Sequence, residues 1–254
     1  MSEPNALTWE VLSDWLSRHP RPYWFFDLDG TLIDLASRPD AVSVSPDLIA
    51  SLERLQSRFD GRVAIVSGRS LADLESRVPV PITRVGNHGA EFRQGGARWV
   101  LPLDRRVQDA FDRLRPHLRA LASQYPGAFL EDKGPTISFH VRHLSPSETN
   151  SARHALQRLM AREAGLVMRP AQACWEIRPE HGPDKGLALE TLLGAGGDDE
   201  PIVFGDDVTD EDAFRAAARH HGLTVVVGPR RPTQAGYRLD RPSDLRDLLH
   251  RLTS

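Results

Sequence analysis

The fold is decided by the stretch Tyr23-Trp24-Phe25-Phe26-Asp27-Leu28-Asp29-Gly30-Thr31-Leu32. Its first four residues are aromatic, and the run is too short for a helix, which favours a buried strand. The strand stops at Asp27 and Asp29, and we expect both carboxylates on one side because strand side chains alternate. Gly30, directly after them, allows a sharp turn or a close approach to a ligand.

Two carboxylates at the end of a buried strand repel each other, and a cation between them relieves the repulsion. Their oxygen atoms suit Mg²⁺, which binds one or two carboxylates together with phosphate oxygens and water. The competing interpretation is that Asp29-Gly30 is an ordinary turn. An isolated Asp-Gly would favour the turn, whereas two aspartates after an aromatic strand favour a magnesium site.

The composition describes an ordinary globular protein of 254 residues, 40% hydrophobic and 26% charged. Its net charge of −3, from 35 acidic and 32 basic residues, gives no reason to expect nucleic acid or a membrane as a partner. Cys174 is the only cysteine, which excludes an intrachain disulfide and a cysteine zinc site. The first twenty residues carry no apolar signal-peptide region, so we expect a cytoplasmic protein.

A second buried strand is predicted at residues 62–66, after a helix that begins at Ser45-Pro46-Asp47. It ends in Ser67-Gly68-Arg69-Ser70, where a hydroxyl, a glycine and backbone N–H groups can cradle a phosphate. We expect Ser67 to contact the phosphate and Ser70 to cap the next helix. Ligands of open parallel sheets bind at the carboxyl ends of the strands, which is where these residues fall.

Lys185 opens a predicted helix, where the positive end of the helix dipole disfavours a lysine. A phosphoryl group nearby explains this cation better than helix stability does. The run Gly86-Asn87-His88-Gly89 predicts a tight loop where backbone meets ligand. The alternative there is a plain turn with a solvated histidine.

A further buried strand, residues 201–205, runs directly into a cluster of acidic residues. We expect Thr209 to cap the helix that follows and Asp210 to suit its first turn. Asp206 and Asp207 precede that cap, so helix stability does not explain them. They repeat the pattern of carboxylates at a strand end and could complete a metal site.

Residues 99–181 change pattern and predict a small α+β module inserted into the parallel domain. Within it, residues 135–142 alternate between apolar and polar side chains, which indicates a strand with one solvated or ligand-facing side. Pro116 predicts a kink or an end in the helix that precedes this strand.

Four segments stand in the order of the signatures of the haloacid dehalogenase superfamily: Asp27-x-Asp29-Gly-Thr-Leu, Ser67-Gly-Arg, Lys185-Gly and Gly205-Asp-Asp-x-Thr-Asp-Glu. Within that superfamily the chain resembles the trehalose-6-phosphate phosphatases. The segments that carry this closer resemblance are Gly86-Asn-His-Gly-Ala-Glu91, Glu131-Asp-Lys133, His140-x-Arg142, Glu176-Ile-Arg-Pro179 and Lys185-Gly-x-Ala-Leu189. The resemblance covers most of the chain, from Trp24 to about Val227.

The resemblance implies an α/β fold with a Rossmann-like parallel sheet core of the haloacid dehalogenase type and an inserted α+β type-II cap. We place the discontinuous core at residues 21–98 and 182–254, and the cap at residues 99–181. Residues 1–20 lie outside the resemblance and are expected to form a helical extension, capped by Thr8.

The resemblance also implies a Mg²⁺-dependent phosphatase that hydrolyses trehalose 6-phosphate through an aspartyl-phosphate. Asp27 would attack phosphorus, and Asp29 would act first as general acid and then as general base. The direct ligands of Mg²⁺ would be the Asp27 carboxylate, the Asp29 backbone carbonyl and Asp206. Asp207 or Asp210 would act behind these ligands or through a bound water. The phosphoryl oxygens would be held by Ser67, Gly68 and Lys185.

Sugar recognition would fall to Glu131, Lys133 and Glu176 of the cap, whose closure would exclude water. Further candidates for the same pocket are Arg69, His88, Arg142 and Arg178. The expected partner is a small sugar phosphate, with no nucleic acid and no membrane, and a trehalose-6-phosphate synthase as partner stays open.

Three alternatives remain open at this point. The first keeps the chemistry but changes the substrate to sucrose phosphate, mannosyl-phosphoglycerate or another hexose phosphate. The second is a phosphomutase, which would return the phosphoryl group to a sugar. The third is a non-catalytic binding or regulatory domain, against which the presence of every expected acid and base argues.

Overall fold

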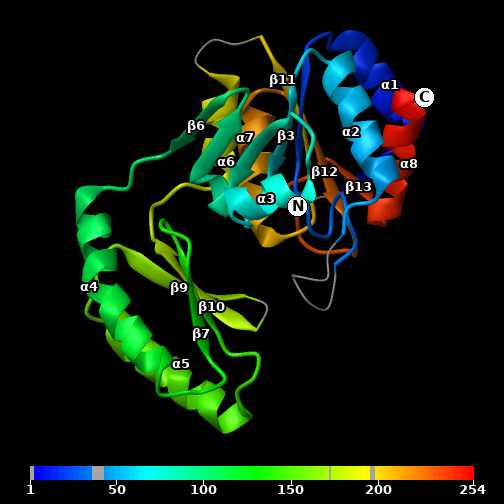
Figure 1. Cartoon of the computed structure of the whole chain (residues 1–254). Helices are drawn as coiled ribbons and strands as arrows, with labels where there is room; N and C mark the ends of the chain where they lie inside the picture. Colours follow the sequence, from blue (N-terminus) through cyan, green and yellow to red (C-terminus); the bar gives the residue numbers. More distant parts are fainter. Residues whose placement is uncertain (1–2, 36–42, 172, 195–197) are drawn as a thin grey trace. The chain divides into compact units, whose positions relative to one another are not determined.

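The computed structural model describes residues 3–35, 43–171, 173–194 and 198–254 (Figure 1). The chain divides into two compact units, Met1–Val100 with Asp184–Ser254, and Leu101–Pro183. The second unit is one segment inserted into the first, so the predicted α/β fold with an inserted α+β module is confirmed. No helix among the described residues has both the length and the apolar composition needed to cross a bilayer.

The larger unit is built on a nine-stranded sheet, counted over the described residues. Across the sheet, from the edge strand β1 through its centre to β4, each strand runs parallel to its neighbours. Beyond β4, the strands β5 and β6 add an antiparallel hairpin at the other edge. In spatial order the strands are β1 (Asn5–Ala6), β13 (Tyr237–Leu239), β12 (Leu223–Val227), β11 (Glu200–Gly205), β2 (Pro22–Phe26), β3 (Val63–Val66), β4 (Thr83–Gly86), β5 (Glu91–Gln94) and β6 (Ala97–Val100).

Strand order reverses at the centre of this sheet. From β2 the chain continues through β3 and β4 on one side, and later through β11, β12 and β13 on the other. Open parallel sheets bind ligands in the crevice outside the carboxyl ends of the strands at such a reversal. The carboxyl ends of β2 and β11 are therefore where a site is expected.

Helices cover both faces of the sheet because β2 is apolar on both sides. Trp24 and Phe26 belong to the core cluster that α1, α2 and α8 complete, and these three helices lie together in Figure 1. Phe25 points the other way and lines a small cavity with Leu189 of α6 and Ala213 of α7. The helices and 3₁₀ turns are α1 (Trp9–Arg18), α2 (Pro46–Arg58), α3 (Leu71–Arg77), η2 (Asn87–Gly89), α6 (Lys185–Leu193), η3 (Val208–Asp210), α7 (Glu211–Arg219) and α8 (Pro242–Thr253).

The N-terminal segment differs from the helical extension that the sequence predicts. The helix and its Thr8 cap are confirmed, since the Thr8 side chain accepts a hydrogen bond from the Val11 N–H. Residues 5 and 6, however, form β1, which pairs with β13 at the edge of the sheet. A two-residue strand has no sequence periodicity, so only its distant partner reveals it.

Over its described residues, the inserted unit is a four-stranded antiparallel sheet with α4 (Arg105–Ala122) and α5 (Pro146–Met160) packed on one face. Its strands in spatial order are β7 (Phe129–Asp132), β8 (Ile137–His140), β10 (Cys174–Pro179) and β9 (Leu166–Ala171). The alternative that the helix ends at Pro116 is wrong, because α4 continues through it, while a kink there stays a prediction. Pro116 is exposed, so water can take the backbone carbonyl that the missing N–H would have bonded.

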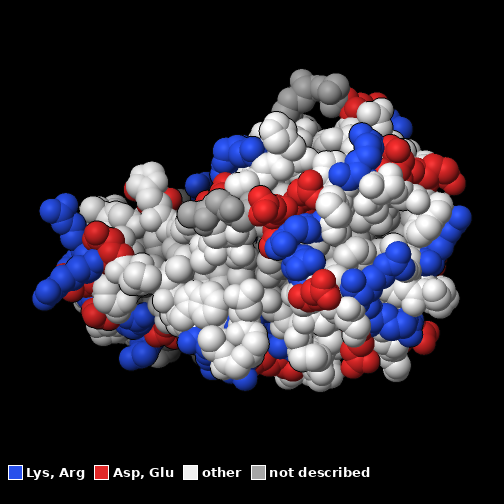
Figure 2. Space-filling model, turned by 90° about the horizontal axis from the view of Figure 1, so that it is seen from above, with Lys and Arg blue, Asp and Glu red and all other residues white. Residues whose placement is uncertain are grey.

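Figure 2 shows Lys and Arg side chains interspersed with Asp and Glu side chains on the face that it draws, in keeping with the net charge of −3. Interspersed charges of both signs favour solubility and give this face no strong field of one sign.

Candidate active site

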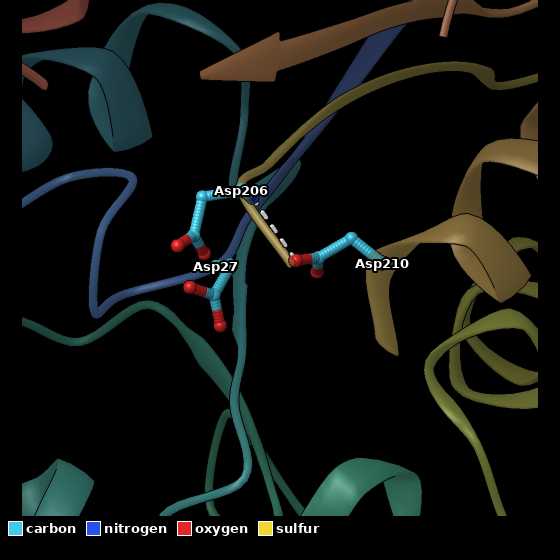
Figure 3. Close-up of side chains that lie close together, drawn as sticks. All are labelled: Asp27, Asp206 and Asp210. Carbon is cyan, nitrogen blue, oxygen red and sulfur yellow. Dashed lines mark hydrogen bonds between the residues drawn. The ribbon is translucent and has the colours of Figure 1, made fainter. Parts of the chain in front are cut away.

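Three buried or partly buried carboxylates meet at the carboxyl ends of β2 and β11. Asp27 directly follows β2, and its backbone N–H donates to the Phe204 carbonyl of β11 at 2.9 Å. Asp206 directly follows β11, and Asp210 lies one short turn further along the chain. One oxygen from each of the three carboxylates lies within 4.8 Å of the others (Figure 3). Adjacent parallel strands thus bring together residues that are far apart in the sequence.

Lys185 supplies the positive charge of this cluster. It is the first residue of α6, and only 3% of its side chain is exposed. Its Nζ donates to Asp27 Oδ1 and to Asp210 Oδ1, both at 2.7 Å. Burial alone would lower the pKa of Lys185, but the two carboxylates raise it above its ordinary value, so the ammonium stays charged. The hydrogen bonds to the two carboxylates offset the electrostatic cost of placing the Lys185 charge at the N-terminus of a helix.

Asp210 organises the loop that carries Asp206. Its Oδ2 accepts hydrogen bonds from the backbone N–H groups of Asp206 and Asp207, at 3.1 and 3.0 Å. The expectation that Thr209 caps the helix is wrong, because Thr209 lies inside the turn η3 and Asp210 is the residue at the N-cap of α7. Asp207 caps η3 by accepting from the Val208 N–H. Asp207 is therefore an exposed capping residue, whereas Asp210 is buried in the cluster.

The cluster carries an excess of negative charge in a poorly hydrated place. Burial raises the pKa of Asp27 well above its usual range, and the charges of Asp210 and Asp206 add to this while Lys185 opposes it. Burial and the neighbouring Asp210 raise the pKa of Asp206 to about 7. A set of oxygen ligands that is hard to ionise without a counter-charge fits a hard divalent cation such as Mg²⁺.

Gly30 is required by this arrangement. Its backbone adopts a φ of +85°, which favours glycine, and a Cβ there would lie 2.1 Å from Asp206 Oδ2. The turn after β2 therefore packs directly against the carboxylate that follows β11.

Asp29 is placed by a side chain rather than by strand geometry. The strand β2 ends at Phe26, so the expectation that alternation sets Asp27 and Asp29 on one side does not apply. Arg69 instead holds Asp29 with two hydrogen bonds, Nε to Oδ2 at 2.6 Å and Nη2 to Oδ1 at 2.7 Å. The same guanidinium donates to Asp73 Oδ2 at 2.6 Å. Arg69, expected in the sugar pocket, thus forms the link between two carboxylates.

The predicted phosphate cradle lies at the end of β3. Ser67 is buried, and its Oγ accepts from the Arg69 N–H at 3.2 Å. The His88 ring packs against Gly68, where a Cβ would lie 2.5 Å from it, and the His88 N–H donates to the Ser67 carbonyl. Asn87 and His88 both have left-handed backbones, with φ of 48° and 54°, which cost energy in residues other than glycine. The strained loop therefore holds His88 against the cradle.

The remaining predicted residues lie in the inserted unit. Glu131 of β7 and Glu176 of β10 both pair with Ser138 of β8, so the two carboxylates flank Ser138 on one face of the sheet. The neighbouring Ile137 and Phe139 point to the opposite face, into the core with α4 and α5. The face with the carboxylates is thus the one that these helices leave uncovered.

Around Glu131 the polar side chains form a small group. The His140 Nε2 lies 3.0 Å and the Lys133 Nζ 3.8 Å from Glu131 Oε2. Arg178 follows Glu176 by two residues on β10, so it shares the face of Glu176. Arg142 is exposed in the turn that follows β8, not in the strand as the alternation predicted.

Two residues next to the cluster were missed. They are Asp73, which accepts a hydrogen bond from Arg69, and Arg231. Arg231 donates to the backbone carbonyls of Asp206 and Asp207. Its sequence surroundings, Arg230-Arg231-Pro232, contain no pattern that distinguishes one arginine from the other.

Fold and site together define an α/β protein with a lysine-bridged carboxylate cluster at the carboxyl ends of a parallel sheet. A family model described as "Trehalose-phosphatase" matches residues 25–243. The chain belongs to the trehalose-phosphatase family.

Curated relatives agree with this assignment. The chain is 33% identical over 236 residues to the trehalose-6-phosphate phosphatase of Escherichia coli K12, covering 91% of this chain and 86% of the relative. It is 38% identical over 217 residues to a probable trehalose-phosphate phosphatase of Sinorhizobium fredii, covering 82% of this chain and 78% of the relative.

Solved structures show the same fold. The C-terminal domain of a Candida albicans trehalose-6-phosphate phosphatase superposes with a TM-score of 0.80 at 23% identity, covering 99% of both chains. A trehalose-6-phosphate phosphatase related protein superposes with a TM-score of 0.74 at 27% identity, covering 91% of this chain and 96% of the other.

Proposed function

We propose that this protein is a phosphatase of the haloacid dehalogenase superfamily that hydrolyses trehalose 6-phosphate to trehalose and phosphate. The observation that carries the proposal is the buried cluster of Asp27, Lys185 and Asp210 beside Asp206, in a chain of the trehalose-phosphatase family. Buried carboxylates locked by a lysine at a strand reversal are costly for folding, and phosphoryl transfer gives them a use.

Asp27 is assigned as the nucleophile. Its carboxylate would attack phosphorus in line with the sugar oxygen, so the P–O bond to the sugar breaks as the aspartyl-phosphate forms. Lys185 contacts only Oδ1 of this carboxylate in its hydrogen bond, and it favours the ionised form that a nucleophile needs. Water would then attack the aspartyl-phosphate, releasing phosphate and restoring Asp27.

Asp29 is assigned as the general acid and base. It would give a proton to the departing sugar oxygen and later take one from the attacking water. The two hydrogen bonds from Arg69 fix the direction in which this carboxylate points. Orientation of a proton donor matters because a small misplacement lowers the rate strongly.

Mg²⁺ is assigned to the side of the cluster formed by Asp27 and Asp206, with the Asp29 carbonyl as a further ligand. The raised pKa values of Asp27 and Asp206 support this assignment, because both groups need a counter-charge to ionise together. When bound, Mg²⁺ would neutralise charge on the phosphoryl group and orient it. Asp210 would act behind the direct ligands, since its oxygens already bond Lys185 and two backbone N–H groups.

Ser67, Gly68 and Lys185 are assigned to the phosphoryl oxygens, and Glu131, Lys133 and Glu176 to the sugar hydroxyls. Support for the second group is their shared location on the uncovered face of the inserted sheet or beside it. Glu131 is exposed, Lys133 partly exposed and Glu176 buried. Carboxylates and ammonium groups suit hydroxyl recognition because they form hydrogen bonds with a sugar.

The proposal is tested with a phosphate-release panel of trehalose 6-phosphate, sucrose phosphate, mannosyl-phosphoglycerate and glucose 6-phosphate, with and without Mg²⁺. We expect trehalose 6-phosphate to give the highest kcat/KM and chelation to abolish turnover. Another substrate ranking first would overturn the specificity. Asp27→Asn should lower kcat by more than about 1,000-fold while the fold is kept, and undiminished turnover in this variant would remove Asp27 from its role.

A further inference from the structure

Arg231 lies in the segment between β12 and β13 and contacts the loop that carries Asp206. Its Nε donates to the Asp206 carbonyl and its Nη2 to the Asp207 carbonyl, both at 2.8 Å. Its Nη1 lies 2.5 Å from Glu211 Oε1. The Arg231 and Glu211 side chains are 19% and 14% exposed, so the pair is largely shielded from water. Nη1 also donates to the neighbouring Pro232 carbonyl at 3.1 Å. A planar guanidinium reaches these four oxygens at fixed angles, which a lysine ammonium on a flexible stem does not.

Asp210 holds the same two residues from their other polar groups. The N–H groups of Asp206 and Asp207 both donate to its Oδ2. Arg231 takes the two carbonyls, so all four backbone polar groups of this dipeptide are bonded by two side chains. The position of the Asp206 Cα, and with it the direction of the side chain, is therefore fixed from outside the loop.

Glu211 in turn fixes Arg231. Besides the ion pair, its second oxygen Oε2 accepts from the Gln234 N–H at 2.8 Å. Glu211 is the first residue of α7, a rigid element that packs against β11 and β12. The guanidinium is thus anchored to the same sheet that positions Asp27.

A brace of this kind is useful because Asp206 faces other negative charges. Its carboxylate lies in the group with Asp27 and Asp210 (Figure 3), and like charges at this range repel. A loop free to move would swing Asp206 away whenever no cation is bound. Binding would then require the loop to be ordered again, and that ordering weakens affinity.

We propose that Arg231 is a positioning residue that holds Asp206 in place for the divalent cation, and thereby sets the affinity of the site for Mg²⁺. The inference rests on the proposed function for the identity of the cation. It assigns to Arg231 no contact with substrate and no part in proton transfer. Mg²⁺ is the more demanding test ion because it requires near-ideal octahedral geometry, whereas Ca²⁺ accepts irregular sites.

The test compares the intact chain with Arg231→Gln and Arg231→Lys, using Arg230→Gln as the matched control. Arg230 is the adjacent arginine, but it is exposed and pairs only with Glu3 among the hydrogen bonds and ion pairs of the described residues. Mg²⁺ and Ca²⁺ are titrated without substrate, by calorimetry and by the rise in Tm. The affinity for Mg²⁺ should fall about 10- to 100-fold in Arg231→Gln, the usual effect of losing a residue that orients a ligand.

The affinity of Arg231→Lys for Mg²⁺ should fall nearly as far, because lysine keeps the charge but cannot bond both carbonyls and Glu211. Both variants should lose more affinity for Mg²⁺ than for Ca²⁺, keep kcat within about threefold at saturating Mg²⁺, and keep the Tm of the metal-free chain within a few degrees. Arg230→Gln should match the intact chain in all measurements.

Equal Mg²⁺ affinity in Arg231→Gln and in the intact chain would overturn the inference and leave the proposed function standing. So would a loss of metal-free Tm large enough to account for the weaker binding, because Arg231 would then be a structural brace only. No binding of Mg²⁺ by the intact chain would instead contradict the metal assignment on which the proposed function depends.

Discussion

The two units of this protein use charged side chains in opposite ways. In the larger unit Lys185 and Asp210 are almost completely buried, and each is held by direct hydrogen bonds. In the inserted unit the Glu131 side chain is 46% exposed on the open face of a sheet. Buried charges need partners whose positions are fixed, whereas exposed charges are stabilised by water and can exchange it for another ligand. The difference separates a region suited to chemistry from one suited to recognition.

The strands of the two units follow the same division. β2 and β11 are apolar on both faces, so polar groups appear only where the strands end. β8 is apolar on one face only: Ile137 and Phe139 point into the core with α4 and α5, while Ser138 and His140 lie on the other face. The two central strands of the larger unit therefore place charged groups only at their ends, whereas β8 carries polar groups along one face.

The largest effect should come from removing Lys185. Lys185→Ala leaves Asp27 and Asp210 buried without their cation, and breaking such a pair costs about 3–5 kcal/mol of unfolding free energy. Turnover should fall by more than about 1,000-fold as well. Thermal unfolding and phosphate release measure the two losses.

The matched control is Lys133→Ala in the inserted unit. Its Nζ lies 3.8 Å from Glu131 Oε2, and the Glu131 side chain is 46% exposed although the Lys133 side chain is 13% exposed. The loss of this one ion pair should therefore change the unfolding free energy by less than about 1 kcal/mol. Equal destabilisation by the two substitutions would remove the distinction between the units.

Arg69→Gln should lower turnover of the sugar phosphate about 100-fold, because Asp29 loses the group that orients it for proton transfer. With p-nitrophenyl phosphate the loss should be only a few-fold, since that leaving group departs without a proton. A comparable loss on both substrates would show that Arg69 acts on binding or folding and not through Asp29.

The pH dependence of Mg²⁺ binding should show an effect of about tenfold between pH 6 and pH 8, since one carboxyl with a pKa near 7 must lose its proton. The pKa of Asp206 is raised in the folded chain, so its contribution to metal-free stability is greatest below the ordinary pKa of 3.8 and is lost as the pH rises through about 7. Mg²⁺ should therefore raise the Tm more at pH 8 than at pH 6. The same Tm increase at both values would contradict a proton on Asp206.

The smallest effect is expected from Glu131→Gln. Because Glu131 is exposed, replacing its charge should raise KM for trehalose 6-phosphate about fivefold, as for the loss of about 1 kcal/mol in one hydrogen bond. Neither kcat with p-nitrophenyl phosphate nor the Tm should change. A lower Tm would place Glu131 among the structural residues of the inserted sheet.

The sequence predicted most of the larger unit because its main features are local. Short runs of consecutive residues predict the apolar strands that end in carboxylates. They also predict the helices that are capped by Ser45 and Ser70. Lys185 stood out because its positive charge is unfavourable at the N-terminus of a helix. Residues that break a local stability rule in this way are often functional.

What was missed depends on contacts between distant residues. The Thr209 cap was wrong because a 3₁₀ turn precedes α7 and leaves Asp210 at the N-cap of the helix. Arg69 bonds Asp29, which lies 40 positions away, and Arg231 bonds the carbonyls of Asp206 and Asp207, which lie 25 and 24 positions away. A long arginine side chain can reach such distant partners, so no local sequence pattern predicts these contacts. The hairpin β5–β6 lies at a sheet edge, where Ala97–Val100 is too exposed to show strand periodicity.

The inserted unit is one uninterrupted segment, whereas the sheet of the larger unit pairs β2 with β11, and β1 with β13. During synthesis on the ribosome, the whole inserted segment emerges before β11 does, so its apolar core can close while β2 still lacks a neighbour on one side. The aspartates that follow β2 then stay hydrated until Asp206 and Asp210 arrive, which spares the nascent chain a buried, uncompensated charge. We therefore expect the carboxylate cluster to assemble only after β11 has been synthesised.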